Sequence, residues 1–352
     1  MPENTGKSSP SLDDQLRSGY RNNGFGAEII GCGVAVPRKV VTNTDLEQVM
    51  DTSDEWIVQR TGIKQRHIHE VKDGETTAAL AADATAKALD SAGLTPADLD
   101  MMLVATMTPD APTPSVSCLA CAKLGTGHIA AIDVNAACSG FVVGLNTASA
   151  MIASGQASTI ALVGADCLTK YMSFSTAGRN TAVLFGDAAA AVIIRRTTDA
   201  SKGLIAQSMH ADGSRSKFLY IETPELSYPE ETELGEDVQL RMHGPAVFRF
   251  AVSTFPQLIA ETLDKAGLQA SDIQHYICHQ SNLRILDAAR DRFGLSAEQM
   301  HTNIDRYGNT VAASAPLVLN DLREAGRVKP GDRAMFLGFG AGLTWASSLW
   351  QL

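Results

Sequence analysis

Cys138 has surroundings that are typical of a reactive cysteine. A short apolar segment at 128–134 predicts a strand before it, and the helical spacing of apolar residues over 140–152 predicts a helix after it. The cysteine therefore falls near the positive end of a helix dipole, which lowers the pKa of a thiol and favours the nucleophilic thiolate. The alternative is a buried structural cysteine, the more common fate of a free cysteine. This segment alone leaves both interpretations open.

Two further segments carry groups that could act on a thioester together with Cys138. His279 follows a short apolar strand predicted over 275–278, and Asn309 lies in a turn before a helix predicted over 316–324. Cysteine supplies a nucleophile, while imidazole and amide groups hydrogen-bond a carbonyl oxygen. Because Cys138 and His279 are far apart in the sequence, only the fold can bring these groups together.

An internal repeat divides the chain into two similar halves. Residues 89–94 (Leu-Asp-Ser-Ala-Gly-Leu) return at 263–268 as Leu-Asp-Lys-Ala-Gly-Leu, and we call the spacing that carries Asp90 to Asp264 the repeat offset. Each copy ends an amphipathic pattern that predicts a helix, and its glycine stands where helices end. A short apolar strand is predicted after each copy, at 101–105 and 275–278. A chance repeat is the alternative to a duplication.

The repeat predicts that the candidate residues share one site. One repeat offset after Cys138 is position 312, just after Asn309, and one repeat offset after Ala105 is His279. Two similar halves that pack together place equivalent loops face to face, so we expect the three side chains to converge. Strands alternate with helices in each half, which predicts an α/β fold with mostly parallel central sheets.

These segments resemble the thiolase superfamily, and specifically the β-ketoacyl-acyl carrier protein synthase III family. The resemblance extends over residues 27–352 and includes three further motifs: Thr-Ser-Asp-Glu-Trp-Ile-Val-Gln-Arg-Thr-Gly-Ile at 52–63, Phe-Gly-Asp at 185–187 and Gly-Phe-Gly-Ala-Gly-Leu-Thr-Trp at 338–345. It implies a thiolase-like duplicated fold of five layers, α-β-α-β-α, and a homodimer.

The expected organisation of the chain has three parts. Residues 1–25 are polar and lack the apolar core of a signal peptide, so we expect a mobile tail. An N-terminal half at 26–200 would hold the nucleophile, and a C-terminal half at 201–352 would hold the histidine and the asparagine.

The resemblance implies a decarboxylating Claisen condensation that initiates fatty-acid synthesis. Cys138 would take an acyl group from acyl-CoA as a thioester, and the enolate left when malonyl-acyl carrier protein loses CO2 would attack it. His279 and Asn309 would hydrogen-bond the malonyl thioester oxygen, where a carboxylate would repel the developing charge. The backbone N–H groups of Cys138 and Ala341 would form an oxyanion hole. Ala341 stands where the family often has glycine, so its N–H serves only if its φ is negative.

The resemblance also implies binding roles. Trp56 would stack on the adenine of CoA, with Arg60 and Arg179 beside it; a core tryptophan and surface arginines are the alternative. The further implied contacts are Gly244, Asn282, Phe339 and Thr113 for CoA and the substrate, and Arg249, Gln280 and Arg284 for the carrier protein. Pro245 replaces an asparagine common in the family and has no N–H to offer CoA. Thr113 would reach the acyl pocket of the partner subunit and leave room for branched or longer starters, with acetyl also accepted.

Composition limits the partners. The net charge of −10 disfavours nucleic acid or an anionic membrane, although a local basic patch would steer an acidic carrier protein. Six irregularly spaced cysteines and no secretory segment favour reduced thiols in the cytoplasm. Cys118 and Cys121 have metal-like spacing without a second pair, so we expect packing and neither a metal nor a cofactor. No uncharged apolar run is long enough to span a bilayer.

Three other functions stay open at the level of sequence. A related synthase could move the acyl group from Cys138 to a different acceptor. A cysteine hydrolase of the papain type would use the same three residue types, but its local cysteine motif is missing. A subunit that only binds acyl-CoA or a carrier protein would usually lack the nucleophile.

Overall fold

The computed structural model describes residues 24–226, 228 and 239–352. Residues 1–23 of the expected tail lie outside the described residues. The strands are β1 (Gly26–Ala35), β2 (Lys39–Thr42), β3 (Gln65–Ile68), β4 (Met101–Ala105), β5 (Ala130–Val134), β6 (Thr159–Asp166), β7 (Ala188–Thr197), β8 (Gly203–Ala211), β9 (Leu219–Ile221), β10 (Leu240–Met242), β11 (His275–Cys278), β12 (Arg333–Gly340) and β13 (Thr344–Gln351). The α-helices are α2 (Asn43–Glu47), α3 (Asp54–Thr61), α4 (Thr77–Ala92), α5 (Val116–Leu124), α6 (Gly140–Ser154), α7 (Arg179–Ala182), α8 (Gly244–Ala266), α9 (Leu283–Phe293), α10 (Ile304–Tyr307) and α11 (Ser314–Glu324). The short 3₁₀ helices are η1 (Val71–Asp73), η2 (Pro96–Asp98), η3 (Ala137–Ser139), η4 (Leu168–Tyr171), η5 (Gly213–Phe218), η7 (Ala270–Asp272) and η8 (Val311–Ala313).

Two mixed sheets form the centre of the molecule. Their strand orders are β1-β7-β6-β4-β5 and β8-β13-β12-β11. β4 pairs in parallel with β5 and β6, and β11 pairs in parallel with β12, whereas the other pairings in these sheets are antiparallel. The expectation of mostly parallel sheets is therefore wrong. The difference arises because β7 and β13 each run antiparallel to both of their neighbours.

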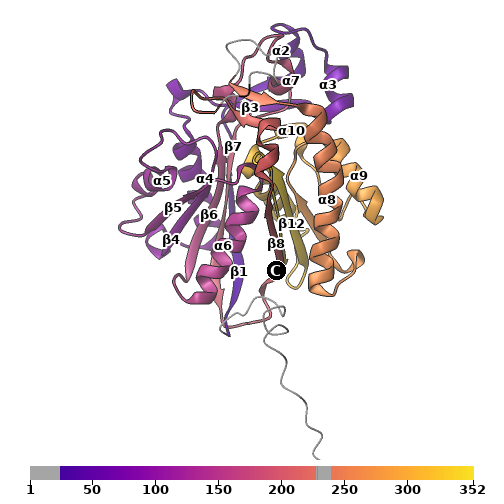
Figure 1. The fold of residues 1–352 in the computed structure, drawn as a ribbon. Helices are drawn as coiled ribbons and strands as arrows, with labels where there is room; N and C mark the ends of the chain where they lie inside the picture. Colours follow the sequence, from indigo (N-terminus) through magenta and orange to yellow (C-terminus); the bar gives the residue numbers. More distant parts are fainter. Residues whose placement is uncertain (1–23, 227, 229–238) are drawn as a thin grey trace, which may run out of the picture.

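Five layers stack across the molecule, alternately helical and sheet (Figure 1). α4 and α5 cover the outer face of the first sheet, and α8 and α9 cover the outer face of the second. α6 and α11 lie between the sheets and bury apolar side chains, among them Phe141, Leu145 and Val318, against both. The predicted α/β class and its five layers are confirmed.

The central helix α6 is apolar around most of its circumference. Within the described residues, the helical stretch Ala137–Ser154 is long and apolar enough to cross a membrane by length and composition, but 72% of it is buried inside the protein. A helix that packs between two sheets needs an apolar surface on both sides, which accounts for this composition.

The repeat in the sequence is also a repeat in the structure. β4 and β11 begin one repeat offset apart, and so do η3 and η8, α6 and α11, and β6 and β12. The glycines that end the repeated helices have nearly equal left-handed conformations, with φ of 66° at Gly93 and 65° at Gly267. All strands of the first sheet come from residues 26–197 and all strands of the second from 203–351, so the chain passes from one sheet to the other between these two ranges.

Smaller elements cover one end of the two sheets. β2, β3, α2, α3, α7 and α10 gather there (Figure 1), around an apolar cluster that includes Leu46 and Ile57. The central strands finish at this end: β6 ends at Asp166 and β12 at Gly340. Ligands of α/β sheets bind outside the carboxyl ends of strands, so this end is where a site is expected.

Candidate active site

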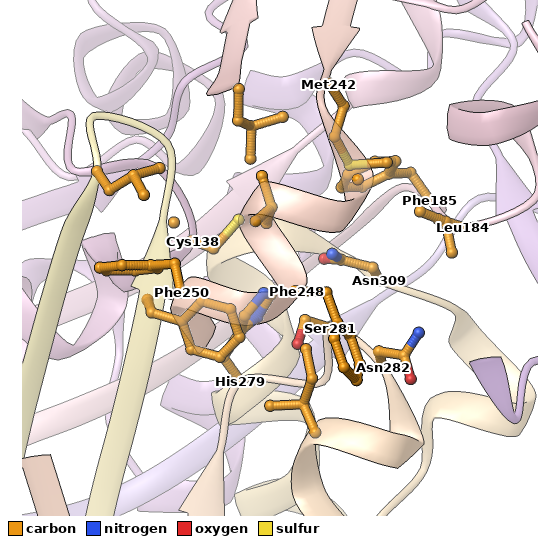
Figure 2. A pocket seen from close by; sticks show the side chains of 17 residues that line it. Cys138, Leu184, Phe185, Met242, Phe248, Phe250, His279, Ser281, Asn282 and Asn309 are labelled. Atoms are coloured by element: carbon orange, nitrogen blue, oxygen red, sulfur yellow. The ribbon is translucent and has the colours of Figure 1, made fainter. Parts of the chain in front are cut away.

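A pocket of about 160 Å³ lies beneath this cover and brings Cys138, His279 and Asn309 together. Figure 2 shows the sulfur, the imidazole and the amide projecting into the same space. Apolar side chains form most of the wall: Leu184, Phe185, Leu219, Met242, Val247, Phe248, Phe250, Ile285, Phe339 and Leu343. Three segments that are distant in sequence therefore meet in one pocket, as the repeat predicts.

A strained turn presents Cys138, the candidate nucleophile, at the start of α6. Ala137 has φ of 47°, which is uncommon for a residue with a side chain. The side chain of Asn135 supports this turn, since its Oδ1 accepts the N–H of Ala137 at 3.3 Å. The chain is thereby redirected from β5 into η3, where Cys138 stands 7% exposed. Sharp strand-to-helix turns of this kind expose catalytic nucleophiles in other folds.

The pKa of Cys138 differs from the expectation. Burial raises the pKa of the Cys138 thiol above its usual value, and the nearby carboxyl of Asp166 raises it further. The dipole at the N-terminus of α6 acts in the opposite direction. The expectation of a lowered pKa is therefore wrong for the folded chain, and the resting thiol is protonated. A nucleophilic role for Cys138 would therefore require a group that accepts the thiol proton.

The turn that carries Asn309 repeats this geometry. Val311 is the equivalent of Ala137 at the repeat offset and has φ of 53°, and Oδ1 of Asn309 accepts its N–H at 2.9 Å. Because Oδ1 is engaged, the Nδ2 group of Asn309 is the donor left for the pocket. The backbone of Asn309 donates to the carbonyl of Leu184 at 2.9 Å and accepts the N–H of Gly186 at 3.0 Å. These bonds hold the amide in place.

His279 is buried and neutral. It is 1% exposed, and burial lowers its pKa to about 3, so the imidazole carries a single proton at neutral pH. Its ring packs edge-on against Phe339, with 5.5 Å between ring centres and 77° between planes. Nδ1 lies 2.6 Å from Oγ of Ser314. Because Nδ1 is engaged there, Nε2 is the nitrogen left for the pocket.

The turn after β12 packs against the backbone of the nucleophile. A Cβ at Gly340 would lie 2.6 Å from the nitrogen of Cys138 and 3.0 Å from its Cβ, so only glycine allows this approach. A hydrogen bond of 3.0 Å from Oγ of Ser139 to Oγ1 of Thr344 joins the nucleophile loop to the same turn.

The departure from the family pattern at Ala341 is accommodated. Among the described residues other than glycine, positive φ occurs at Ala137 and Val311 and not at Ala341. An alanine therefore fits this turn without left-handed strain. The φ of Ala341 is not positive, so its N–H meets the condition required of an oxyanion donor.

A second cavity adjoins the pocket and opens beside Trp56. It is lined by Trp56, Arg60, Thr61, Asn180, Val183, Leu184, Phe248, Asn282 and Arg284, of which Leu184, Phe248 and Asn282 also line the first pocket. The guanidinium groups of Arg60 and Arg179 lie over the indole of Trp56, at 4.6 Å and 5.1 Å from its ring centre. An aromatic and cationic cluster thus stands at the outer end of a route that leads to Cys138.

Of the other residues expected to contact the substrate, three line the pocket and Thr113 does not. Gly244, Asn282 and Phe339 line the pocket. Pro245 stands at the N-terminus of α8, where a missing N–H costs the helix nothing. Thr113 lies exposed on the loop before α5 and does not line the two adjoining cavities.

Of the three residues expected to dock the carrier protein, two are exposed and one is buried. Arg284 and Arg249 are exposed, and Arg249 lines a shallow cavity with Arg215. Gln280 is 1% exposed, its Nε2 donates to the carbonyl of Cys278 at 2.9 Å, and its Oε1 accepts the N–H of Asn303 at 3.2 Å. The prediction that Gln280 contacts a carrier protein is therefore wrong, because this amide is used inside the fold.

Sequence reasoning missed Asp166, a fully buried carboxyl group behind the nucleophile. Its Oδ1 accepts the N–H of Met107 at 2.9 Å and the hydroxyl of Thr108 at 3.0 Å, while its Oδ2 accepts the N–H of Ala312 at 3.2 Å. Burial raises the pKa of Asp166 to about 7. The repeat could have drawn attention to this residue, because Asp166 is equivalent at the repeat offset to Gly340, which lies in the turn beside Cys138.

Cys118 and Cys121 have different surroundings. Cys118 is exposed, and the thiol of Cys121 lies 3.8 Å from the sulfur of Met102. Within the part of the chain that the structure describes, no three residues of the ligand types His, Cys, Asp and Glu gather as a metal site would require.

The fold and the pocket define a class of protein. Two duplicated α/β halves that join a cysteine, a histidine and an asparagine at the ends of their strands make a condensing enzyme of the thiolase type. Two family models for 3-oxoacyl-[acyl-carrier-protein] synthase III match the chain, one at residues 132–213 and the model of the C-terminal region at 263–352. The chain belongs to the 3-oxoacyl-[acyl-carrier-protein] synthase III family and is an acyltransferase.

Similar proteins support this assignment over most of the chain. The β-ketoacyl-[acyl-carrier-protein] synthase III of Geobacillus kaustophilus is 44% identical over 323 residues, which are 92% of this chain and 98% of that protein. The crystal structure of the synthase III from Aquifex aeolicus has a TM-score of 0.85 and 38% identity, and the match covers 93% and 100% of the two chains. A priming β-ketosynthase from the R1128 polyketide biosynthetic pathway has a TM-score of 0.83 and 32% identity, with 93% and 96% covered.

Proposed function

We propose that this protein condenses an acyl-CoA starter with malonyl-acyl carrier protein to give a 3-oxoacyl-acyl carrier protein, CO2 and CoA. This would be the first condensation of fatty-acid synthesis. The observation that supports it best is the pocket shared by Cys138, His279 and Asn309, at the inner end of a route that opens beside Trp56. Two adjoining cavities, one with a stacking site and one with a thiol, suit a long thioester such as CoA.

In the first half-reaction, Sγ of Cys138 attacks the thioester carbonyl of acyl-CoA. The thiol is protonated at rest, so its proton passes to Nε2 of His279 as the carbon–sulfur bond forms. The backbone N–H groups of Cys138 and Ala341 stabilise the tetrahedral oxyanion. CoA then leaves as a thiol with that proton, and the acyl group stays on Cys138. Reaction through this acyl-enzyme gives ping-pong kinetics.

In the second half-reaction, malonyl-acyl carrier protein enters and loses CO2. The electrons of the broken bond pass into an enolate whose negative charge develops on the thioester oxygen. Nδ2 of Asn309 and Nε2 of His279 donate hydrogen bonds to that oxygen. The enolate carbon then attacks the acyl group and releases Cys138 as a thiolate, which takes up a proton from solvent and returns to the resting thiol. The apolar wall around these donors strengthens their interaction with the developing charge.

Four arginines fit the two acidic partners. Trp56, with Arg60 and Arg179 over its ring, would hold the adenine and phosphates of CoA. Arg249 and Arg284 would receive the acidic carrier protein. On a chain with a net charge of −10, such a local basic surface steers the partner toward the opening of the route.

The proposed active form is a homodimer, and we expect it in the cytoplasm. β5 is the last strand of the first sheet, and Ile132 on it is 42% exposed. An open edge strand with an exposed apolar side chain is suited to pairing with a second copy. Thr113, which is exposed in the single chain, would then reach the acyl pocket of the partner subunit.

Variants of the three pocket residues test this function. Cys138→Ser should abolish transfer of a radiolabelled acyl group from acyl-CoA to the protein, because an alcohol replaces the thiol. Asn309→Ala should leave this acylation within about threefold of the wild type but slow release of CO2 from malonyl-acyl carrier protein by about 100-fold or more. Equal loss of both half-reactions in Asn309→Ala would contradict the assigned roles. Wild-type protein that forms no 3-oxo product would end the proposal.

A second candidate differs in the pathway that uses the product. The similarity to a priming β-ketosynthase from a polyketide pathway, at 32% identity, favours a test of starters other than acetyl. Turnover compared over a panel of acetyl, branched and longer acyl-CoA separates the candidates. A strong preference against acetyl together with a non-fatty-acid carrier protein would support the polyketide role.

A further inference from the structure

The proposed condensation requires opposite protonation states of one nitrogen, Nε2 of His279, in its two half-reactions. During acylation, Nε2 of His279 must hold a lone pair, because it accepts the proton of Cys138. During decarboxylation, Nε2 must carry a proton, because it donates to the thioester oxygen. A neutral imidazole has one N–H and one bare nitrogen, so a single tautomer serves only one of these steps.

Ser314 holds the other nitrogen of the ring. This residue is 1% exposed, and its Oγ lies 2.6 Å from Nδ1 of His279, 3.2 Å from the backbone nitrogen of Gln280 and 3.0 Å from the carbonyl oxygen of Val311. A hydroxyl has one proton and two lone pairs. The N–H of Gln280 occupies one lone pair. The one proton then has two possible acceptors, the carbonyl of Val311 and the nitrogen of His279.

These two positions of the hydroxyl select the two tautomers. When Ser314 donates to the carbonyl of Val311, Nδ1 of His279 must be the donor and Nε2 is bare. When Ser314 donates to Nδ1, the ring proton is on Nε2. The carbonyl of Val311 also accepts the backbone N–H of Ser314, so it keeps a partner in both positions. Rotation of the hydroxyl therefore leaves no buried polar group of this cluster without a hydrogen bond.

The repeat shows that the fold does not itself require this hydroxyl. At the repeat offset, Ser314 is equivalent to Gly140 and His279 to Ala105. A Cβ at Gly140 would lie 3.2 Å from the Cβ of Ala105, so the same two positions also adjoin in the first half. There they hold no polar side chain, although α6 begins as α11 does. A serine is therefore present at the start of the helix in the half that has the histidine, and absent at the equivalent position in the half that lacks it.

We propose, on the basis of the condensation described above, that Ser314 is a positioning residue whose hydroxyl allows His279 to use a different tautomer in each half-reaction. In acylation, the thiol proton moves to bare Nε2 and then to the departing CoA sulfur, which returns the ring to its starting form. After CoA leaves, exchange with solvent replaces the proton on Nδ1 by one on Nε2, with no net transfer, while the hydroxyl of Ser314 turns toward Nδ1. Decarboxylation then proceeds with Nε2 as a donor.

The first test reads the tautomer directly. In protein labelled with ¹⁵N-histidine, the imidazole signals of His279 are identified by their absence from His279→Ala. We expect Nδ1 to be protonated in the free enzyme and Nε2 to become the main protonated nitrogen in the acyl-enzyme. One unchanged tautomer in both forms of the wild-type protein would overturn the proposal. This comparison needs no variant of Ser314, so it holds even if such a variant fails to fold.

The second test separates positioning from folding. Ser314→Ala should slow acylation and decarboxylation by about tenfold or more each, with KM for acyl-CoA unchanged, and should lock His279 in one tautomer. Ser348→Ala is the control, since it removes another buried hydroxyl, one that accepts the indole N–H of Trp350 at 2.7 Å. A Ser314→Ala protein with wild-type rates and tautomers refutes the proposal. Failure of the wild-type protein to form any acyl-enzyme instead refutes the condensation on which it rests.

Discussion

Cys138 is held between opposing electrostatic influences. Its burial and the carboxyl of Asp166 disfavour the thiolate, while the N-terminus of α6 favours it. A thiol that stays protonated until a proton acceptor and a thioester are both in place is protected from alkylation and oxidation. In the proposed reaction, reactivity at this residue therefore depends on neutral His279 rather than on the thiol alone.

Asp166→Asn should change how stability depends on pH. Burial raises the pKa of Asp166 from 3.8 to about 7 in the folded protein, so the folded state binds its proton more tightly than the unfolded state does. The stabilisation from this group is complete below its unfolded pKa and is lost as the pH rises through 7. Relative to the variant, the free energy of unfolding of the wild type should fall by on the order of 4 kcal/mol between pH 4 and pH 8.

Urea unfolding of both proteins across this pH range measures the difference. The amide removes the titration but also faces the N–H of Ala312, which gives a constant offset in stability. The pH dependence, and not the offset, is therefore the observable. A difference that is the same at pH 4 and pH 8 would show that Asp166 does not titrate as described.

Individual residues were predictable where their type and chain neighbours carried the signal. Cys138, His279 and Asn309 each stand at the end of a recognisable strand or turn, and the repeat related them. Ser314 and Gln280 could not be judged in this way, because burial and hydrogen bonds to distant segments decide what they do. A glutamine beside a catalytic histidine is equally suited to docking or to an internal bond until the packing is known.

At the scale of elements, the turn after β12 determines how closely the second half approaches the nucleophile. Gly340 faces the backbone of Cys138 at a distance that excludes a side chain, and Thr344 fixes the turn to Ser139. The sequence identified this Gly-Ala-Gly segment by resemblance. It could not give the pairing directions of β12 and β13, because apolar strands of similar length form parallel and antiparallel pairs alike.

Gly340→Ala should inactivate the enzyme while the fold persists. The new Cβ would lie 2.6 Å from the nitrogen of Cys138, so the nucleophile or the turn must move. We expect acylation of Cys138 by acyl-CoA to fall by about 100-fold or more, since small displacements of reacting groups have such effects.

Gly213→Ala is the matched control for this variant. A Cβ at Gly213 would meet nothing within 4 Å, and its φ is not in the left-handed range. This variant should acylate at the wild-type rate, as followed by mass spectrometry of the intact protein. Normal acylation of Gly340→Ala would mean that the turn is free to retreat from the nucleophile.

At the scale of the whole molecule, the duplication determines both architecture and site. The repeat offset, visible in the sequence, predicted two halves and the meeting of three loops, while the five layers were implied by the family resemblance. The surface that joins two copies of the chain was less accessible to sequence reasoning. Strand β5 has an ordinary apolar composition, and only its place at the edge of the sheet shows that it lacks a neighbour on one side among the described strands.

Ile132→Lys should weaken the proposed homodimer. Ile132 is 42% exposed on the edge strand β5, and a charge placed there would have to be buried between two copies. Sedimentation velocity should show the mass of one chain where the wild type shows two, and turnover should fall because Thr113 no longer reaches a partner. Val71→Lys, at a position 67% exposed on η1, should leave both properties unchanged. A dimer that survives Ile132→Lys at low micromolar concentration would place the interface elsewhere.

The left-handed kinks at Ala137 and Val311 have a consequence for how the chemistry is distributed. Both halves retain the same bend, each braced by its own asparagine, yet one bend offers a sulfur and the other offers an amide donor. Position 312, the counterpart of Cys138, holds only the methyl group of alanine. In the proposed reaction, two copies of one ancestral unit have thus specialised, one for attack and one for charge stabilisation. Neither copy, expressed by itself, would contain a complete reaction centre.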